Sequence, residues 1–207
     1  LDPHRVGIDS LSGHWDAYYD TWGTRDWTHA NALAYDAEDD SYVVSLRHQD
    51  AVIKVDRASG ELVWILGNPA HWEAPWSDAL LQPDPSVAWP YHQHATTVTR
   101  DGTVLMFDNG NYRSPAFGER LPAAENHSRA VEFRVDGDQV SEVWSHELEE
   151  YAQFLGDADR LEGGNTLIDI GGITEDAEGN WSEFGGRMRA RIIEVTPEGE
   201  VVFDLHV

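Results

Sequence analysis

The chain has 207 residues, 41% of them hydrophobic, and carries 38 acidic against 14 basic side chains, for a net charge of −24. This length is sufficient for a substantial buried core, and so acidic a surface would repel the phosphate backbone of a nucleic acid, which argues against that partner. Cysteine is absent, so disulfides contribute nothing, and the sequence has no apolar run near the ~20 residues of a membrane-spanning helix.

A hairpin-forming unit with a polar residue at one fixed place occurs three times. Each copy has a strand, a turn rich in acidic residues or glycine, and a second strand. The copies occupy residues 26–48, 91–110 and 156–172. Aligning them places His29, His94 and Asp157 at equivalent positions. A repeat that keeps a polar group at one spot indicates units that point those groups at a common centre.

A second hairpin follows each of these units. These segments are strand–turn–strand patterns rich in β-branched and aromatic residues, at 55–64, 135–144 and 195–203. Two hairpins per repeat make a four-stranded antiparallel sheet, and such sheets at a period of roughly 40–65 residues are typical of a β-propeller. The sequence therefore predicts an all-β fold in which residues 1–207 are part of one propeller domain.

The expected blade boundaries follow from the repeat. Residues 1–26 are interpreted as the end of a preceding blade, and successive blades are expected at 27–89, 90–152 and 153–207. Propellers typically close with 4–8 blades, and three units would leave open sheet edges. We therefore expect the chain to be part of a longer protein, or the ring to need the remainder of the propeller or other chains to close.

Histidines and arginines gather where the hairpins begin and end. His29 and His94 stand at strand starts, whereas Arg47, His48 and Arg113 stand at or just beyond strand ends. In an antiparallel hairpin these positions lie at the same edge of the sheet, so the five side chains are expected on one face of the propeller. Histidine can attack or shuttle a proton near neutral pH, and arginine offers a planar fork to an oxyanion.

Six short motifs resemble the bacterial arylsulfate sulfotransferase family in order and in rough spacing. They stand at residues 26–31, 45–49, 64–67, 93–94, 107–110 and 128–132. The resemblance implies a six-bladed propeller that transfers a sulfuryl group from a phenolic sulfate ester to a phenol through a sulfated histidine. It implies no nucleotide sulfate donor and no other cofactor. By motif matching, His29, His94 and Arg113 fall where the family has its active-site His, His and Arg.

The resemblance also gives the expected surroundings of the site. The small-molecule partners would be an aryl sulfate and a phenol. Members of the family are usually exported, so a periplasmic or extracellular location is expected, although no signal peptide is visible in this sequence. The side chains expected to bind substrate are Asn31, Arg47, His48, His92, Asn109 and Thr174.

One position departs from the family pattern. The family's sulfated histidine follows the strand that matches residues 165–172, where this chain has Ile173 and Thr174. Transfer through a histidine would then need another nucleophile, and His94, ahead of His29, is the leading candidate.

Two other hypotheses stay open on the sequence. His92 and His94 are two residues apart, which on a strand places both on one face. With Asp157 they would make a metal site of two histidines and one carboxylate, whereas the sulfotransferase interpretation includes no metal. Alternatively, the chain is a propeller that binds aryl anions or a protein partner without catalysis, which Thr174 would favour.

Other prominent residues have structural interpretations. Trp27, Trp64 and Trp144 are expected in blade cores, and Arg129 is expected to bridge strands or to pair with a carboxylate. Residues 68–90 interrupt the repeat with three tryptophans and several prolines. A connection of this length is expected either to wall the mouth of the site or to pack over a blade edge.

Overall fold

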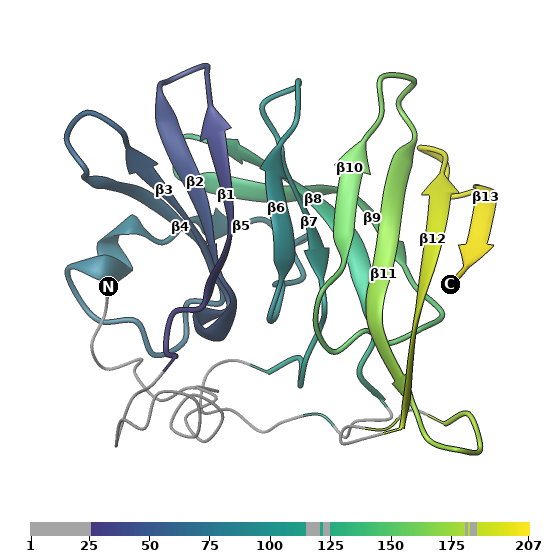
Figure 1. Ribbon diagram of the computed structural model, residues 1–207. Helices are drawn as coiled ribbons and strands as arrows, with labels where there is room; N and C mark the ends of the chain where they lie inside the picture. Colours follow the sequence, from purple (N-terminus) through teal and green to yellow (C-terminus); the bar gives the residue numbers. More distant parts are fainter. Residues whose placement is uncertain (1–25, 115–120, 122–124, 181, 183–185) are drawn as a thin grey trace.

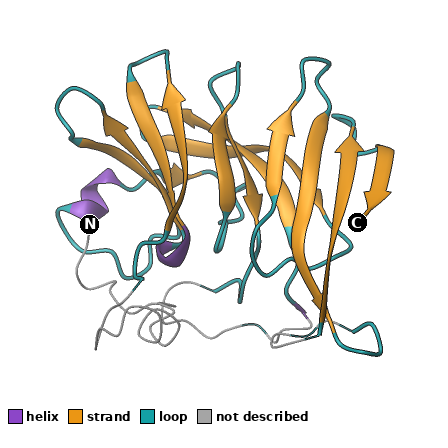
Figure 2. Cartoon of the chain, viewed as in Figure 1, coloured by secondary structure: helices purple, strands orange, loops and turns teal. Residues whose placement is uncertain are grey.

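The computed structural model describes residues 26–114, 121, 125–180, 182 and 186–207. Its regular structure is mainly β-strand, with the short 3₁₀ helices η2 (Arg47–Gln49) and η3 (Trp76–Ala79) (Figure 2). Within these residues, none of the helices has the length and apolar character needed to cross a membrane. The blade end expected at 1–26 lies outside the described residues, apart from Asp26.

Three antiparallel sheets follow one another along the chain, and consecutive strands are hydrogen-bonded neighbours within each. The first sheet consists of β1 (Ala30–Asp36), β2 (Ser41–Leu46), β3 (Ala51–Asp56) and β4 (Leu62–Gly67). The second contains β6 (His94–Val98), β7 (Val104–Asp108), β8 (Arg129–Asp136) and β9 (Gln139–Glu147). The third consists of β10 (Asp157–Arg160), β11 (Thr166–Glu175), β12 (Arg187–Val195) and β13 (Val201–His206).

The sheets are arranged as blades whose first strands lie nearest one another. β1 contacts β6, and β6 contacts β10, so the chain fans out from these inner strands toward β4, β9 and β13 (Figure 1). This confirms an all-β chain that forms part of a β-propeller, with the described sheets in an open fan. The four consecutive strands named for each sheet lie inside the expected ranges 27–89, 90–152 and 153–207, whose boundaries stay a prediction.

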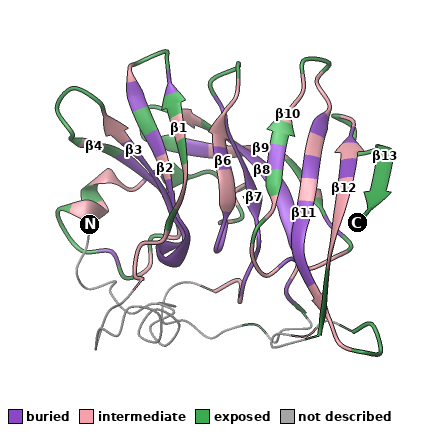
Figure 3. Ribbon diagram, viewed as in Figure 1, coloured by how far each residue is buried: buried purple, intermediate pink, exposed green. Residues whose placement is uncertain are grey.

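Strand β7 shows how alternating side chains join the blades. All five of its residues are buried, and because successive side chains point to opposite faces, they serve two cores. Val104 and Met106 pack with Trp64 of the first sheet, whereas Leu105 and Phe107 pack against the third sheet. The buried strands run through the centre of the fan (Figure 3).

Two of the three tryptophans expected in blade cores lie in or against these clusters. Trp64 is buried in the cluster between the first and second sheets, and Trp144 is half-buried against the cluster between the second and third. Trp27 is half-buried.

Residues 68–90 pack over blade edges. The amide of Leu81 donates to the carbonyl of Ile65 in β4 (2.9 Å), and that of Gln82 donates to the carbonyl of Asp138 (2.8 Å). β5 (Gln82–Pro83) pairs in parallel with β9, so the second sheet has a short fifth strand that the repeat did not predict. Of the two expected roles for this segment, these contacts support packing over a blade edge. Such packing covers strand edges that would otherwise be unpaired.

Candidate active site

The inner strands bring the predicted site residues to one end of the sheets. His29 immediately precedes β1, His94 begins β6 and Asp157 begins β10. The second strand of each hairpin returns to the same end, because Ala30 is paired with Leu46, and His94 with Phe107. Arg47 and Asn109, which follow these partners closely in sequence, therefore stand beside the two histidines.

Backbone strain is concentrated at this end. Left-handed φ angles occur at His29 (47°), His92 (56°) and Arg113 (38°). They also occur at three neighbours of these residues in the site, namely Asp50, Ala95 and Tyr112. For residues other than glycine this conformation costs about 1–3 kcal/mol each, and it persists where the surrounding structure enforces it, often at functional sites.

Three histidines form a row of rings. The ring centroids of His29 and His48 are 4.5 Å apart, and those of His48 and His92 are 6.0 Å apart. Asp26 joins the first two, because its carboxylate contacts Nδ1 of His29 and its backbone carbonyl accepts from Nδ1 of His48. Asp26 belongs to the first sequence motif, but its place in the site was not predicted from the sequence.

His48 is held in one neutral tautomer. It is fully buried, and since Nδ1 donates to a carbonyl, the lone pair is on Nε2. That Nε2 atom is buried without a hydrogen-bond partner among the described residues. The pKa of His48 is lowered to about 4, chiefly by burial. The hydrogen bond to the Asp26 carbonyl raises this pKa, whereas the charges of Arg47, His29 and His92 contribute to lowering it.

His94 is oriented by Asn109. The Asn109 amide nitrogen donates to the carbonyls of Ala152 (2.8 Å) and Leu155 (2.9 Å). Its oxygen must therefore be the atom that faces Nδ1 of His94, at 2.7 Å. Because Nδ1 is the donor in this bond, the neutral ring carries its lone pair on Nε2.

Burial keeps His94 neutral. Burial is the main reason that the pKa of His94 is lowered to about 4, and the charges of Arg47 and His29 contribute to the lowering, while hydrogen bonds to Asn109 and to the backbone of His92 oppose it. The charge of Arg47 contributes to lowering the pKa of both His48 and His94, so it lies close enough to act electrostatically on both rings. The Arg47 guanidinium also donates to the carbonyl of Gln153 (3.2 Å).

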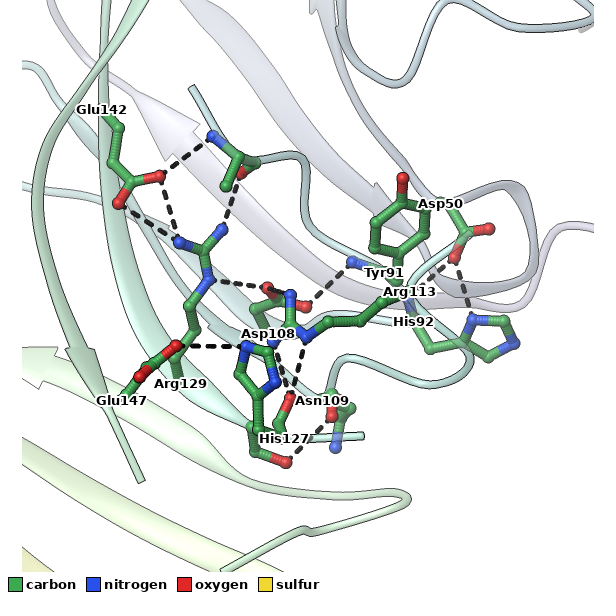
Figure 4. Close-up of polar contacts among 12 residues, drawn as sticks. Asp50, Tyr91, His92, Asp108, Asn109, Arg113, His127, Arg129, Glu142 and Glu147 are labelled. Carbon is green, nitrogen blue, oxygen red and sulfur yellow. Dashed lines mark hydrogen bonds and ion pairs between the residues drawn. The ribbon is translucent and has the colours of Figure 1, made fainter. Parts of the chain in front are cut away.

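Arg113 belongs to a chain of buried charges beside this cluster (Figure 4). Its guanidinium donates to Asp108 (3.1 Å) and twice to the carbonyl of His127 (3.2 and 2.6 Å). These three bonds use three of the five N–H groups of the guanidinium, and the other two take no part in them. Asp108 also accepts from Arg129 (2.9 Å), which in turn pairs with Glu142 (3.1 Å), so the predicted carboxylate pairing of Arg129 is confirmed.

The other predicted substrate-binding residues are tied to protein groups. Asn31 donates to the carbonyl of Gln93 (2.9 Å), and its Oδ1 is buried without a partner among the described residues. His92 is buried, with Nδ1 2.9 Å from the Asp50 carboxylate (Figure 4). Thr174 donates its hydroxyl to the carbonyl of Ser182.

The metal site expected at His92, His94 and Asp157 does not form. His92 has a left-handed backbone and precedes β6, so the strand geometry that would place it beside His94 is absent there. Among the described residues, the group of three that could hold a metal ion is Asp26, His29 and His48.

Two cavities lie between the blades, away from these residues. One of about 560 Å³ is lined by Arg100, Trp144 and Arg160, between the second and third sheets. Another of about 320 Å³ is lined by Asp36, Lys54 and Trp64, between the first and second. Neither is lined by His29, His94 or Arg113.

Comparisons with known proteins agree with the motifs. The arylsulfotransferase (ASST) family model matches residues 1–207. The chain is 33% identical over 178 residues to the arylsulfate sulfotransferase AssT of Escherichia coli O6:H1, covering 72% of this chain and 28% of that protein. It is 32% identical over 144 residues to AssT of Lelliottia amnigena, covering 59% and 23%. The chain thus spans about a quarter of the length of these curated relatives.

Similar solved structures share little sequence identity with this chain. The PQQ-bound aldose sugar dehydrogenase of Streptomyces coelicolor is similar with a TM-score of 0.46 and 13% identity, over 84% of this chain and 46% of that one. A streptogramin B lyase is similar with a TM-score of 0.31 and 12% identity, over 86% and 68%. The family match covers the whole sequence, and this chain belongs to the arylsulfotransferase family.

Proposed function

We propose that this chain supplies the histidine-centred part of an aryl sulfotransferase active site, in which Nε2 of His94 accepts the sulfuryl group. The observation that carries the proposal is the bond between His94 and Asn109 (2.7 Å). It leaves a lone pair on Nε2, and burial keeps the pKa of His94 low enough for the ring to be neutral at pH 7. A neutral, oriented imidazole is the form that a nucleophilic histidine needs.

The proposed reaction has two displacements at sulfur. In the first, Nε2 of His94 forms a bond to sulfur while the bond from sulfur to the aryl oxygen breaks, which gives sulfohistidine and a phenolate. The phenolate takes up a proton. In the second, a new phenol loses its proton and attacks sulfur, and the N–S bond breaks to restore His94. The three sulfate oxygens keep their charge throughout, much as in phosphoryl transfer.

His29 is the proposed proton carrier. Its Nδ1 contacts the Asp26 carboxylate, the arrangement in which an acidic side chain orients an imidazole for acid–base work. The charge of His29 contributes to lowering the pKa of His94, which supports a position near the proposed nucleophile. His29 would give a proton to the first phenolate and take one from the incoming phenol.

Arginines supply the counter-charge for the sulfate group. The charge of Arg47, like that of His29, lowers the pKa of both His48 and His94, so an anion between these rings would lie in the field of the Arg47 guanidinium. The resemblance assigns Arg113 to the same role, and two of its N–H groups lie outside its contacts with Asp108 and His127. A local cationic cluster is needed because the chain as a whole carries a net charge of −24.

The substrates and the location follow from family membership as proposals. The donor would be an aryl sulfate and the acceptor a phenol, without a cofactor. The protein would act in the periplasm or outside the cell. The remainder of the propeller, or other chains, would close the ring around the site.

A sulfated intermediate is the direct test. The longest natural form of the protein is incubated with a chromogenic aryl sulfate, quenched without acid and analysed by intact mass, beside His29→Ala and His94→Ala. We expect an adduct in the wild type and in His29→Ala that is lost in His94→Ala. An adduct that survives in His94→Ala would move the nucleophile elsewhere.

A catalytically inactive, anion-binding propeller is the second candidate. Thr174 stands where the family has its sulfated histidine, and its hydroxyl is committed to the carbonyl of Ser182. Absence of both adduct and phenol release in the wild type, combined with saturable binding of the aryl sulfate, would favour this function over the first.

A further inference from the structure

We propose that Asp26, His29 and His48 form a binding site for a divalent transition-metal ion of the zinc type. One ligand atom from each of these side chains lies within 4.8 Å of the other two. Ligands of a tetrahedral zinc ion at about 2.0–2.2 Å from the metal stand roughly 3.4 Å apart. A shift of about an ångström therefore brings the three atoms onto one ion.

The donor set selects the class of metal. Two imidazoles and one carboxylate suit zinc, cobalt, nickel or iron, whereas calcium and magnesium prefer oxygen ligands alone. Three protein ligands also leave a coordination position open, which is the pattern of zinc sites that bind a further small molecule.

The surroundings of His48 supply an independent observation. A metal-binding histidine generally donates its other ring N–H to a backbone carbonyl or a carboxylate. His48 has that bond to the Asp26 carbonyl, and the nitrogen left with the lone pair, Nε2, is fully buried with no hydrogen-bond partner among the described residues. A buried acceptor without a donor is costly, and a metal ion would satisfy it.

The place of the ion is indicated by the contact between Asp26 and His29. The carboxylate oxygen and Nδ1 are hydrogen-bond partners there, and a dication can take the place of the proton between the same two atoms. Metal binding would then prevent His29 from acting as a general acid or general base. This consequence rests on the proposed sulfotransferase function, whereas metal binding itself does not.

Cobalt titration is the first experiment, with the metal-free protein in its longest natural form. We expect one Co²⁺ per chain with the visible absorption of tetrahedral cobalt, displaced by Zn²⁺. His29→Ala and Asp26→Asn should weaken binding by more than the roughly 10–100-fold typical of changes behind a metal ligand. His127→Ala is the matched control, because His127 pairs with the Glu147 carboxylate (3.3 Å) outside the cluster.

Several outcomes would overturn the site. Absence of Co²⁺ binding at micromolar concentration in the wild type is one, and unchanged binding in both His29→Ala and Asp26→Asn is another. Circular dichroism checks the fold of each variant, and the partly exposed His29 and Asp26 carry the test because His48 is fully buried. Zn²⁺ should also inhibit turnover of the aryl sulfate. Because cobalt binding is read without turnover, an inactive protein leaves the metal test intact.

Discussion

The side-chain oxygen of Asn109 lies 2.7 Å from Nδ1 of His94, and both hydrogens of the same amide are used on the carbonyls of Ala152 and Leu155. The amide cannot turn over without losing these bonds, so it fixes both the ring and the tautomer of His94. Asn109 was predicted from the sequence to bind substrate. Its contacts support a positioning role instead.

Asn109→Ala should lower kcat/KM by roughly 10–100-fold, because the ring loses its fixed tautomer and orientation. The hydrogen bond to Asn109 raises the pKa of His94, so the acid limb of the pH–rate profile should move to lower pH in the variant. Asn165→Ala, whose side chain contacts Glu194 in the third sheet, is the control. A rate loss with an unmoved acid limb would indicate a purely structural role.

The acid limb of kcat/KM in the wild type should fall near pH 4. Burial lowers the pKa of His94 to about 4, so the nucleophile stays neutral through the range in which an exposed histidine, with a pKa of about 6.5, would become protonated. Steady-state rates with an aryl sulfate from pH 3.5 to pH 8 measure this. A limb near pH 6.5 would contradict His94 as the titrating group.

Stability should depend on pH through the same residue. The folded pKa of His94 lies below the unfolded value, so its contribution is fully present above about pH 6.5 and is lost as pH falls toward 4. Between about pH 6.5 and pH 4, the free energy of unfolding should therefore fall less in His94→Gln than in the wild type. The difference should be up to about 3 kcal/mol. Urea denaturation of both proteins at pH 7 and pH 4.5 gives the difference. An equal loss of unfolding free energy in both proteins between pH 7 and pH 4.5 would contradict this prediction.

Asp108→Asn should destabilise the protein by roughly 3–5 kcal/mol, because it removes a buried carboxylate that two guanidiniums share. Asp108 is fully buried between Arg113 and Arg129. The matched control is Asp40→Asn, whose partner Arg57 is exposed and whose loss should cost less than about 1 kcal/mol. Chemical denaturation compares them, and equal effects would contradict the importance of burial.

Gly110→Ala should destabilise the protein and displace Arg113. A Cβ at Gly110 would stand 2.0 Å from the carbonyl of His127 and 2.6 Å from the Arg113 guanidinium. Gly137→Ala is the control, since Gly137 has a similar positive φ but nothing within 4 Å of the added carbon. The difference in melting temperature between the two variants measures the effect of the steric contact at Gly110. Equal melting temperatures would show that the chain around Gly110 accommodates the added carbon.

Much of the fold could be predicted from local sequence. Alternating apolar residues and glycine-bearing turns specify hairpins through nearest-neighbour geometry, so the three sheets and the inner position of their first strands follow from the repeat. The parallel strand β5 did not follow from it, because its pairing partner β9 is more than fifty residues away in sequence. Nothing in the two residues of β5 themselves encodes that pairing.

The site divides in the same way. The repeat and the motifs identified His29, His94 and Arg47, because their positions at strand ends are set by hairpin register. Which groups touch was decided only by the tertiary structure. Asn109 turned toward His94 because carbonyls of Ala152 and Leu155, from the connection into the next blade, hold its amide, and the left-handed backbone of His92 turned that ring toward Asp50. Sequence thus determined the residue types at the end of each blade, while packing between blades determined their partners, since hydrogen bonds across separate loops depend on distances that no local pattern records.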